Sequence, residues 1–87
     1  MSELVEQMKS LRVSAATTEL VTRILALFPQ ARIVPREVPW SDEEISLEVY
    51  LPGTPEELDE AQDKVIDCFI EVQDKYGLLI HVSVLPE

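Results

Sequence analysis

The segment from Thr54 to Gly77 constrains the fold of this 87-residue chain more than any other. Residues 54–57 read Thr-Pro-Glu-Glu, which combines a hydroxyl N-cap, a proline in the first turn and a glutamate three residues after the cap. Apolar side chains then recur every three or four residues until Gly77, a typical helix stop. These positions are Leu58, Ala61, Val65, Cys68, Phe69, Val72 and Tyr76. The pattern predicts one amphipathic helix.

Strand patterns flank this helix on both sides. Apolar and polar residues alternate from Ile45 to Leu51, which is typical of a strand with one buried and one open face. The segment from Leu78 to Leu85 has no charged residue and is rich in β-branched residues, so we expect a strand near the sheet centre. Two strands joined by a helical crossover in one sheet are parallel.

A further strand is expected at about residues 32–38. Pro35 cannot donate a ladder hydrogen bond, which favours an edge position or a bulge. The short connection at residues 39–43 is typical of a hairpin, so this strand should run antiparallel to the next. The sheet is therefore expected to be three-stranded and mixed.

The first 28 residues are helical by composition, but their apolar positions do not form one stripe. One side carries Leu4, Met8, Leu11 and Ala15, and another carries Val13, Leu20, Ile24 and Leu27. A single helix would also be about 40 Å long, against roughly 30 Å expected for the breadth of such a domain. We therefore expect a break or sharp bend near Val13 and Ser14, with residues 1–13 forming an arm available for oligomer contacts.

The predicted fold is a two-layer α+β sandwich, one domain over residues 1–87, in the order helix (broken), strand, strand, helix, strand. Both helices cover the same face of the sheet. The opposite face carries Ser46, Glu48, Tyr50, His81 and Ser83, with either Val34, Arg36 and Val38 or Ile33 and Glu37 from the first strand.

Charge and composition exclude several classes of function. Seventeen Asp and Glu against seven Lys and Arg give a net charge of -10, which disfavours nucleic-acid binding. No apolar run reaches the roughly 18 residues of a membrane span, and no secretory signal pattern opens the chain, so a cytoplasmic protein is expected. Cys68 is the only cysteine and falls on a buried stripe, so neither a disulfide nor a zinc site is expected. No cofactor is predicted.

The open sheet face is the first candidate site. Glu48 and His81 can approach each other from neighbouring strands, where a carboxylate would raise the histidine pKa and make it a proton carrier. Ser83 shares that face, but these groups are no catalytic triad without an oxyanion pocket. We therefore predict no catalytic residue and interpret the face, with Tyr50, as a self-association surface.

The hairpin tip is the second candidate site. Trp40 lies beside three carboxylates and is either a binding anchor or a cover that folds back over the sheet edge or the N-terminal helix. Asp42 and Glu44 alternate along the entering strand and can point the same way to hold Mg²⁺.

Residues 23–34, followed by Ser-Asp-Glu-Glu-Ile at 41–45, resemble the opening of the minimal nucleotidyltransferase family. The order of elements matches over residues 20–85. The resemblance implies Mg²⁺-assisted phosphoryl transfer, with Asp42 and Glu44 as ligands. Residues 35–39 lack the family's Gly-Ser loop, and His81 or Ser83 stands where its third carboxylate belongs, so the resemblance implies a scaffold that has lost catalysis.

The sequence thus predicts a small acidic binding or interaction module that is dimeric and non-catalytic, with a protein as its partner. One alternative is a Mg²⁺-dependent, nucleotidyltransferase-like protein. Another is an acidic mimic of nucleic acid, or an inhibitor, that presents the carboxylates of residues 56–74 to a basic protein. We otherwise interpret those carboxylates as a solvated helix face, on which Glu71 and Lys75 are spaced to pair within the helix.

Overall fold

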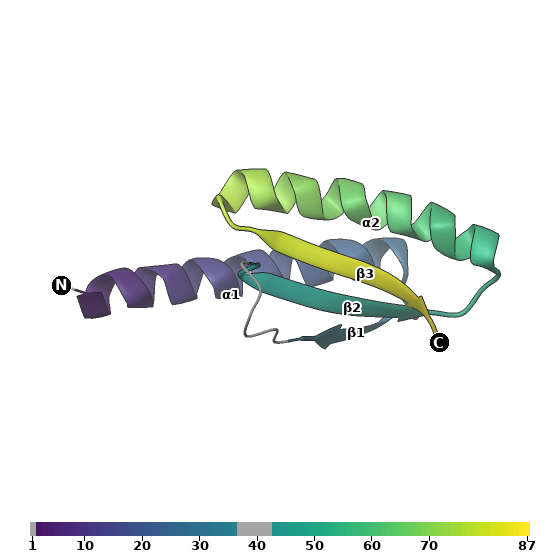
Figure 1. Cartoon of the computed structure of the whole chain (residues 1–87), viewed down its shortest axis with the longest axis horizontal. Coiled ribbons are helices and arrows are strands. Elements are labelled where there is room, and N and C mark those ends of the chain that lie inside the picture. The colour runs from purple at the N-terminus through teal and green to yellow at the C-terminus, as the bar shows by residue number, and fades with distance from the viewer. Residues whose placement is uncertain (1, 37–42) are drawn as a thin grey trace.

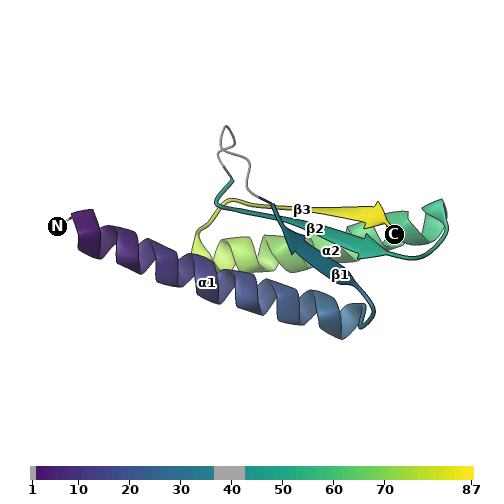
Figure 2. The same cartoon turned by 90° about the horizontal axis from the view of Figure 1, so that it is seen from below.

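The computed structural model describes residues 2–36 and 43–87, with side chains from residue 8 onward. The elements are helix α1 (Ser2–Leu27), strands β1 (Arg32–Pro35) and β2 (Ile45–Leu51), helix α2 (Pro55–Tyr76) and strand β3 (Ile80–Pro86). The strands form one sheet in the order β1-β2-β3, and both helices lie on the same side of it (Figure 1, Figure 2). The predicted α+β sandwich with a three-stranded mixed sheet is confirmed.

The strand register fixes which side chains share a face. β1 pairs antiparallel with β2, so that Val34 lies opposite Glu48. β2 pairs parallel with β3, as the helical crossover predicted, so that Glu48 also lies opposite Ser83. Residues of β2 alternate between buried and half-buried from Ile45 to Leu51, which confirms the predicted two-faced strand.

Helix α2 begins and ends where its sequence predicts. The Thr54 hydroxyl accepts a hydrogen bond from the Glu57 N–H at 3.2 Å, and the Glu57 carboxylate accepts one from the Thr54 N–H at 3.1 Å. The hydrogen bond from the Thr54 N–H, together with the Thr54 hydroxyl, holds the pKa of Glu57 below its ordinary value. At the other end Gly77 adopts a left-handed conformation and donates its N–H to the Gln73 carbonyl at 2.8 Å. Residues next to each end of the helix thus form hydrogen bonds with terminal backbone groups of α2.

Helix α1 corrects the prediction of a broken helix. It runs continuously from Ser2 to Leu27, without the break expected near Val13 and Ser14. This range contains no glycine or proline, the residues at which helices most often kink. Its second half buries Ala16, Leu20 and Ile24 completely. Its first half extends past the sheet (Figure 1), and the longest dimension of the molecule is 50 Å. The shift in the apolar stripe marks the boundary between packed and unpacked helix.

The position of β3 is a second correction. We expected this uncharged strand near the sheet centre, but the central strand is β2 and β3 lies at an edge. Helix α2 packs along β3, and Ile80 and Val82 are buried although the described residues give β3 no second neighbouring strand. The core lies between the sheet and both helices, and its largest fully buried side chains are Leu20, Ile24, Leu78, Val49, Val65, Val72 and Val82.

Candidate functional site

The face of the sheet turned away from the helices is the candidate site. The register places on it Arg32, Val34, Arg36, Ser46, Glu48, Tyr50, His81, Ser83 and Leu85. Of the two alternatives for β1, the one with Val34 and Arg36 is confirmed, because Ile33 packs against the core instead. Glu37 and Val38 lie outside the described residues. The predicted face is therefore formed as expected over the strands that the structure describes.

Two arginines lie over this face. The Arg36 Nη1 atom donates to Glu48 Oε1 at 3.0 Å, and the Glu48 side chain is only 18% exposed. The Arg32 guanidinium carbon lies 4.4 Å from the centroid of the Tyr50 ring, a cation–π geometry. Arg32 Nε also lies 3.7 Å from a carboxylate oxygen of Glu87. Both arginines are therefore held against the sheet by contacts within the chain.

Glu48 and His81, which we expected to act together as a proton carrier, have other hydrogen-bond partners. His81 Nε2 lies 3.0 Å from the Ser83 hydroxyl oxygen, and the histidine is exposed. Glu48 is paired with Arg36, and the register sets Glu48 opposite Ser83 while His81 lies opposite Ser46. Glu48 and His81 are thus diagonal neighbours with separate hydrogen-bond partners. This geometry supports a polar surface better than an acid–base pair.

The hairpin site falls partly outside the described residues. Trp40 and Asp42 belong to the segment 37–42, so the predicted anchor and the predicted Mg²⁺ pair remain predictions. Glu44 Oε1 lies 3.7 Å from the Lys9 ammonium nitrogen, and the Glu44 N–H donates to the Leu79 carbonyl at 2.9 Å. Among the side chains of residues 8–36 and 43–87, no group of three or more Cys, His, Asp and Glu is arranged to hold a metal ion.

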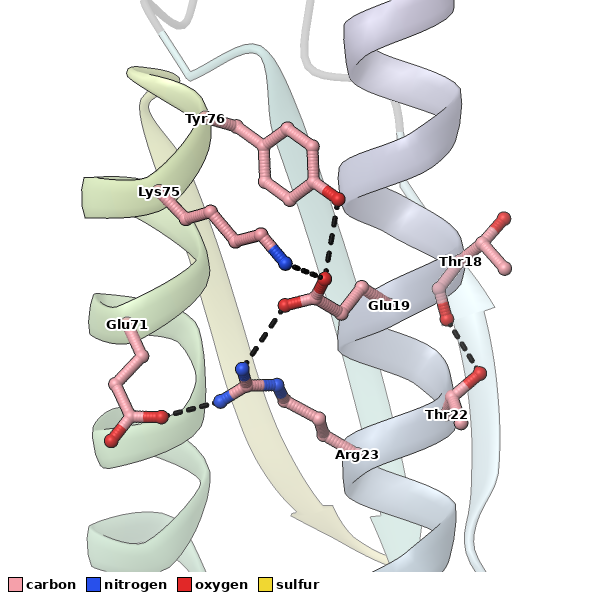
Figure 3. Close-up of polar contacts among 7 residues, drawn as sticks. All are labelled: Thr18, Glu19, Thr22, Arg23, Glu71, Lys75 and Tyr76. Atoms are coloured by element: carbon pink, nitrogen blue, oxygen red, sulfur yellow. Dashed lines mark hydrogen bonds and ion pairs between the residues drawn. The ribbon is translucent and has the colours of Figure 1, made fainter.

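A charged network between the helices was not predicted (Figure 3). The Glu19 carboxylate of α1 lies 2.6 Å from Lys75 Nζ, accepts from the Tyr76 hydroxyl at 3.2 Å and lies 3.1 Å from Arg23. Arg23 also pairs with Glu71, so the expected Glu71–Lys75 pair within α2 is replaced by two pairs across the helices. The hydrogen bond from Lys75 lowers the pKa of Glu19 and raises that of Lys75. This network links α1 to α2 beside the apolar core that the two helices share.

The remaining candidates behave as solvated or packed groups. The acidic side chains of α2 are exposed, and apart from Glu57 in the capping box and Glu71 in the network they fit a solvated face, which leaves the acidic-mimic alternative a prediction. They are Glu56, Glu57, Asp59, Glu60, Asp63, Asp67, Glu71 and Asp74. Cys68 is half-buried against the core, and burial raises the pKa of its thiol. A thiol of that kind is a poor nucleophile at neutral pH.

Comparison of the chain with protein-family models, curated proteins and solved structures returned no match. The resemblance to minimal nucleotidyltransferases therefore stays a prediction. Neither helix, over the residues that the structure describes, combines the length and apolar character needed to cross a bilayer.

Proposed function

We propose that this protein is a small non-catalytic binding module that self-associates through the open face of its sheet. The observation that carries the proposal is the composition of that face. Half-buried Val34, Tyr50 and Leu85 lie among Arg32 and Arg36 there. Tyrosine and arginine are enriched at protein interfaces and among the residues that dominate binding energy. The cation–π contact already orders one such pair before a partner arrives.

Charge favours this face over the helix layer. Two copies of a chain with net charge -10 repel each other, so self-association needs the least acidic surface available. The open face carries two arginines, Arg32 and Arg36, against Glu48 and the Glu87 carboxylate that contacts Arg32. The outer surface of α2 carries the dense carboxylates instead. Face-to-face packing places α2 and the packed second half of α1 of each copy on the outside, separated by two sheets and beyond a Debye length of about 8 Å.

The size of the sheet indicates that a second surface contributes. Three strands of up to seven residues cover about 23 by 14 Å, or roughly 330 Å² of footprint. A typical stable interface buries about 800 Å² per partner. The first half of α1 extends beyond the sheet (Figure 2). It exposes Met8 (61%) and Leu11 (71%). We propose that these side chains complete the contact with the second copy.

Sedimentation equilibrium over a range of protein concentrations tests the proposal. We expect a dimer whose Kd rises at least tenfold in Tyr50→Ala, because an aromatic side chain near the interface centre is removed. Leu11→Ala should raise the Kd by a smaller factor. The matched control is Ile70→Ala, which removes an apolar side chain of 43% exposure from α2 and should leave the Kd unchanged.

Two outcomes would contradict the proposal. One is a parent protein that is monomeric at every concentration. The other is a dimer weakened as much by Ile70→Ala as by Tyr50→Ala, which would place the interface on the helix layer.

A further inference from the structure

The outer edge of β3 has an unusual set of hydrogen-bond partners. Among the residues that the structure describes, β3 has β2 on one side and no strand on the other. The Leu79 carbonyl and the Glu87 N–H bond to residues at the two ends of β2, which fixes the alternation along β3. Ile80, Val82 and Val84 therefore direct their backbone groups away from the sheet. A long, uncharged edge of this kind is a template for pairing with another strand.

Two glutamines of α2 occupy this edge. Gln62 Oε1 accepts from the Val84 N–H at 2.9 Å, while Gln62 Nε2 donates to the Val82 carbonyl at 3.3 Å. Gln73 Oε1 accepts from the Ile80 N–H at 3.1 Å. The two glutamines are about three helical turns apart, so both face β3 from the same side of α2.

The Gln62 amide reproduces the bonding of a neighbouring strand. In a parallel pair, a residue opposite Ser83 would donate its N–H to the Val82 carbonyl and accept from the Val84 N–H. The side-chain amide makes the same two bonds. This arrangement also explains how an edge strand can have the uncharged sequence of a central one.

We infer that Gln62 and Gln73 close the β3 edge to strand addition, and that the edge, once opened, pairs with β3 of a second copy. The occupant follows from the sequence, because residues 78–85 carry no charge in a chain of net charge -10. A β-branched segment of low charge without an internal proline is the type that pairs with itself. Pairing through β3 is distinct from the proposed contact through the open face.

The opposite edge of the sheet is closed differently. The Arg36 N–H donates to the Ser46 carbonyl at 2.8 Å, so Ile33 and Pro35 direct their backbone groups outward. Proline has no N–H, which leaves Ile33 as the one outward donor within β1. An added strand would find few backbone donors along β1. The β3 edge is therefore the one at which strand addition has to be prevented.

Removal of both glutamines tests the inference. In Gln62→Ala/Gln73→Ala we expect species of at least twice the parent's mass, increasing with concentration, and a new infrared band of intermolecular β-structure. Alanine favours the helix, so α2 itself is not weakened. The control is Gln30→Ala, which removes an exposed glutamine between α1 and β1. Assembly is measured relative to the parent, whether that is a dimer or a monomer.

A rescue variant and hydrogen exchange identify the edge. Adding Val84→Pro to the double variant removes an outward N–H and should restore the parent's mass. In Gln62→Ala alone, the Val84 amide should exchange at least tenfold faster, while the Ile80 amide, held by Gln73, is unchanged. The inference is overturned if Val84 exchange does not change, if the folded double variant keeps the parent's mass, or if assembly persists with Val84→Pro. If the double variant does not fold, hydrogen exchange of the Val84 amide in Gln62→Ala tests whether Gln62 protects the β3 edge.

Discussion

Gly77 shows how much a single residue contributes to this fold. Its φ of 65° lies in the left-handed region, and an added Cβ would meet no atom within 4 Å. The cost of Gly77→Ala is therefore backbone strain alone, about 1 kcal/mol of unfolding free energy. Gly77→Asn should cost less, since asparagine tolerates this conformation better. Urea denaturation of the two variants checks the prediction, and equal costs would contradict it.

At this scale the sequence was informative, because the signals are local. The capping box of Thr54 and Glu57 and the stop at Gly77 depend on bonds that span only a few residues. The alternation from Ile45 to Leu51 also identified the open face, since a period of two needs no knowledge of distant contacts. The partners of Glu48 and His81 were not predictable, because the register of neighbouring strands decides them.

Between elements, the contacts of α1 were the least predictable. The expected break followed from the shift in the apolar stripe of the N-terminal residues and from the length of a single helix. The structure leaves Met8 and Leu11 exposed on a continuous helix, so a shifted stripe does not by itself require a break in α1. The sequence alone also did not predict the Glu19 network, because ion pairs between α1 and α2 depend on how the two helices are placed.

This network makes a prediction about pH. The pKa of Glu19 is lowered in the folded protein, so its contribution is present above the unfolded pKa of about 4.3 and is lost as the pH falls through the lower folded value. The pKa of Lys75 is raised, so its contribution is present below about 10.4 and is lost as the pH rises through the higher folded value.

We therefore expect Glu19→Gln to be less stable than the parent near pH 7, with the difference shrinking at pH values below about 4. The control is Glu56→Gln, which removes an exposed carboxylate outside this network. Denaturation at a series of pH values measures both differences. A Glu19→Gln difference that stays constant across the acid range would contradict the assigned role of the carboxylate.

At the scale of the whole molecule, net charge and edge protection set the modes of association. The prediction that β3 is central failed because an uncharged strand can be shielded by a helix as well as by strands on both sides. Gln62 and Gln73 provide that shielding, and their roles depend on how α2 is placed over the sheet. Closed edges leave the open face, with Val34 and Tyr50, as the sheet surface available to a second copy.

Salt should strengthen the proposed dimer. Each copy carries a net charge of -10, and raising the ionic strength shortens the Debye length from about 10 Å at 0.1 M to about 3 Å at 1 M. Screening weakens the repulsion between copies more than it weakens apolar contacts. We expect the Kd to fall several-fold between these conditions in sedimentation experiments. A dimer that dissociates with added salt would indicate instead that arginines of one copy pair with carboxylates of the other.

The central claim is that two copies meet through their open sheet faces. Isotope-filtered NMR on a mixture of labelled and unlabelled protein detects contacts between copies and excludes those within one copy. The account predicts intermolecular NOEs from the Tyr50 ring to Val34 or Leu85 methyl groups. Intermolecular NOEs that involve α2 side chains such as Ile70 and none from the open face would contradict it.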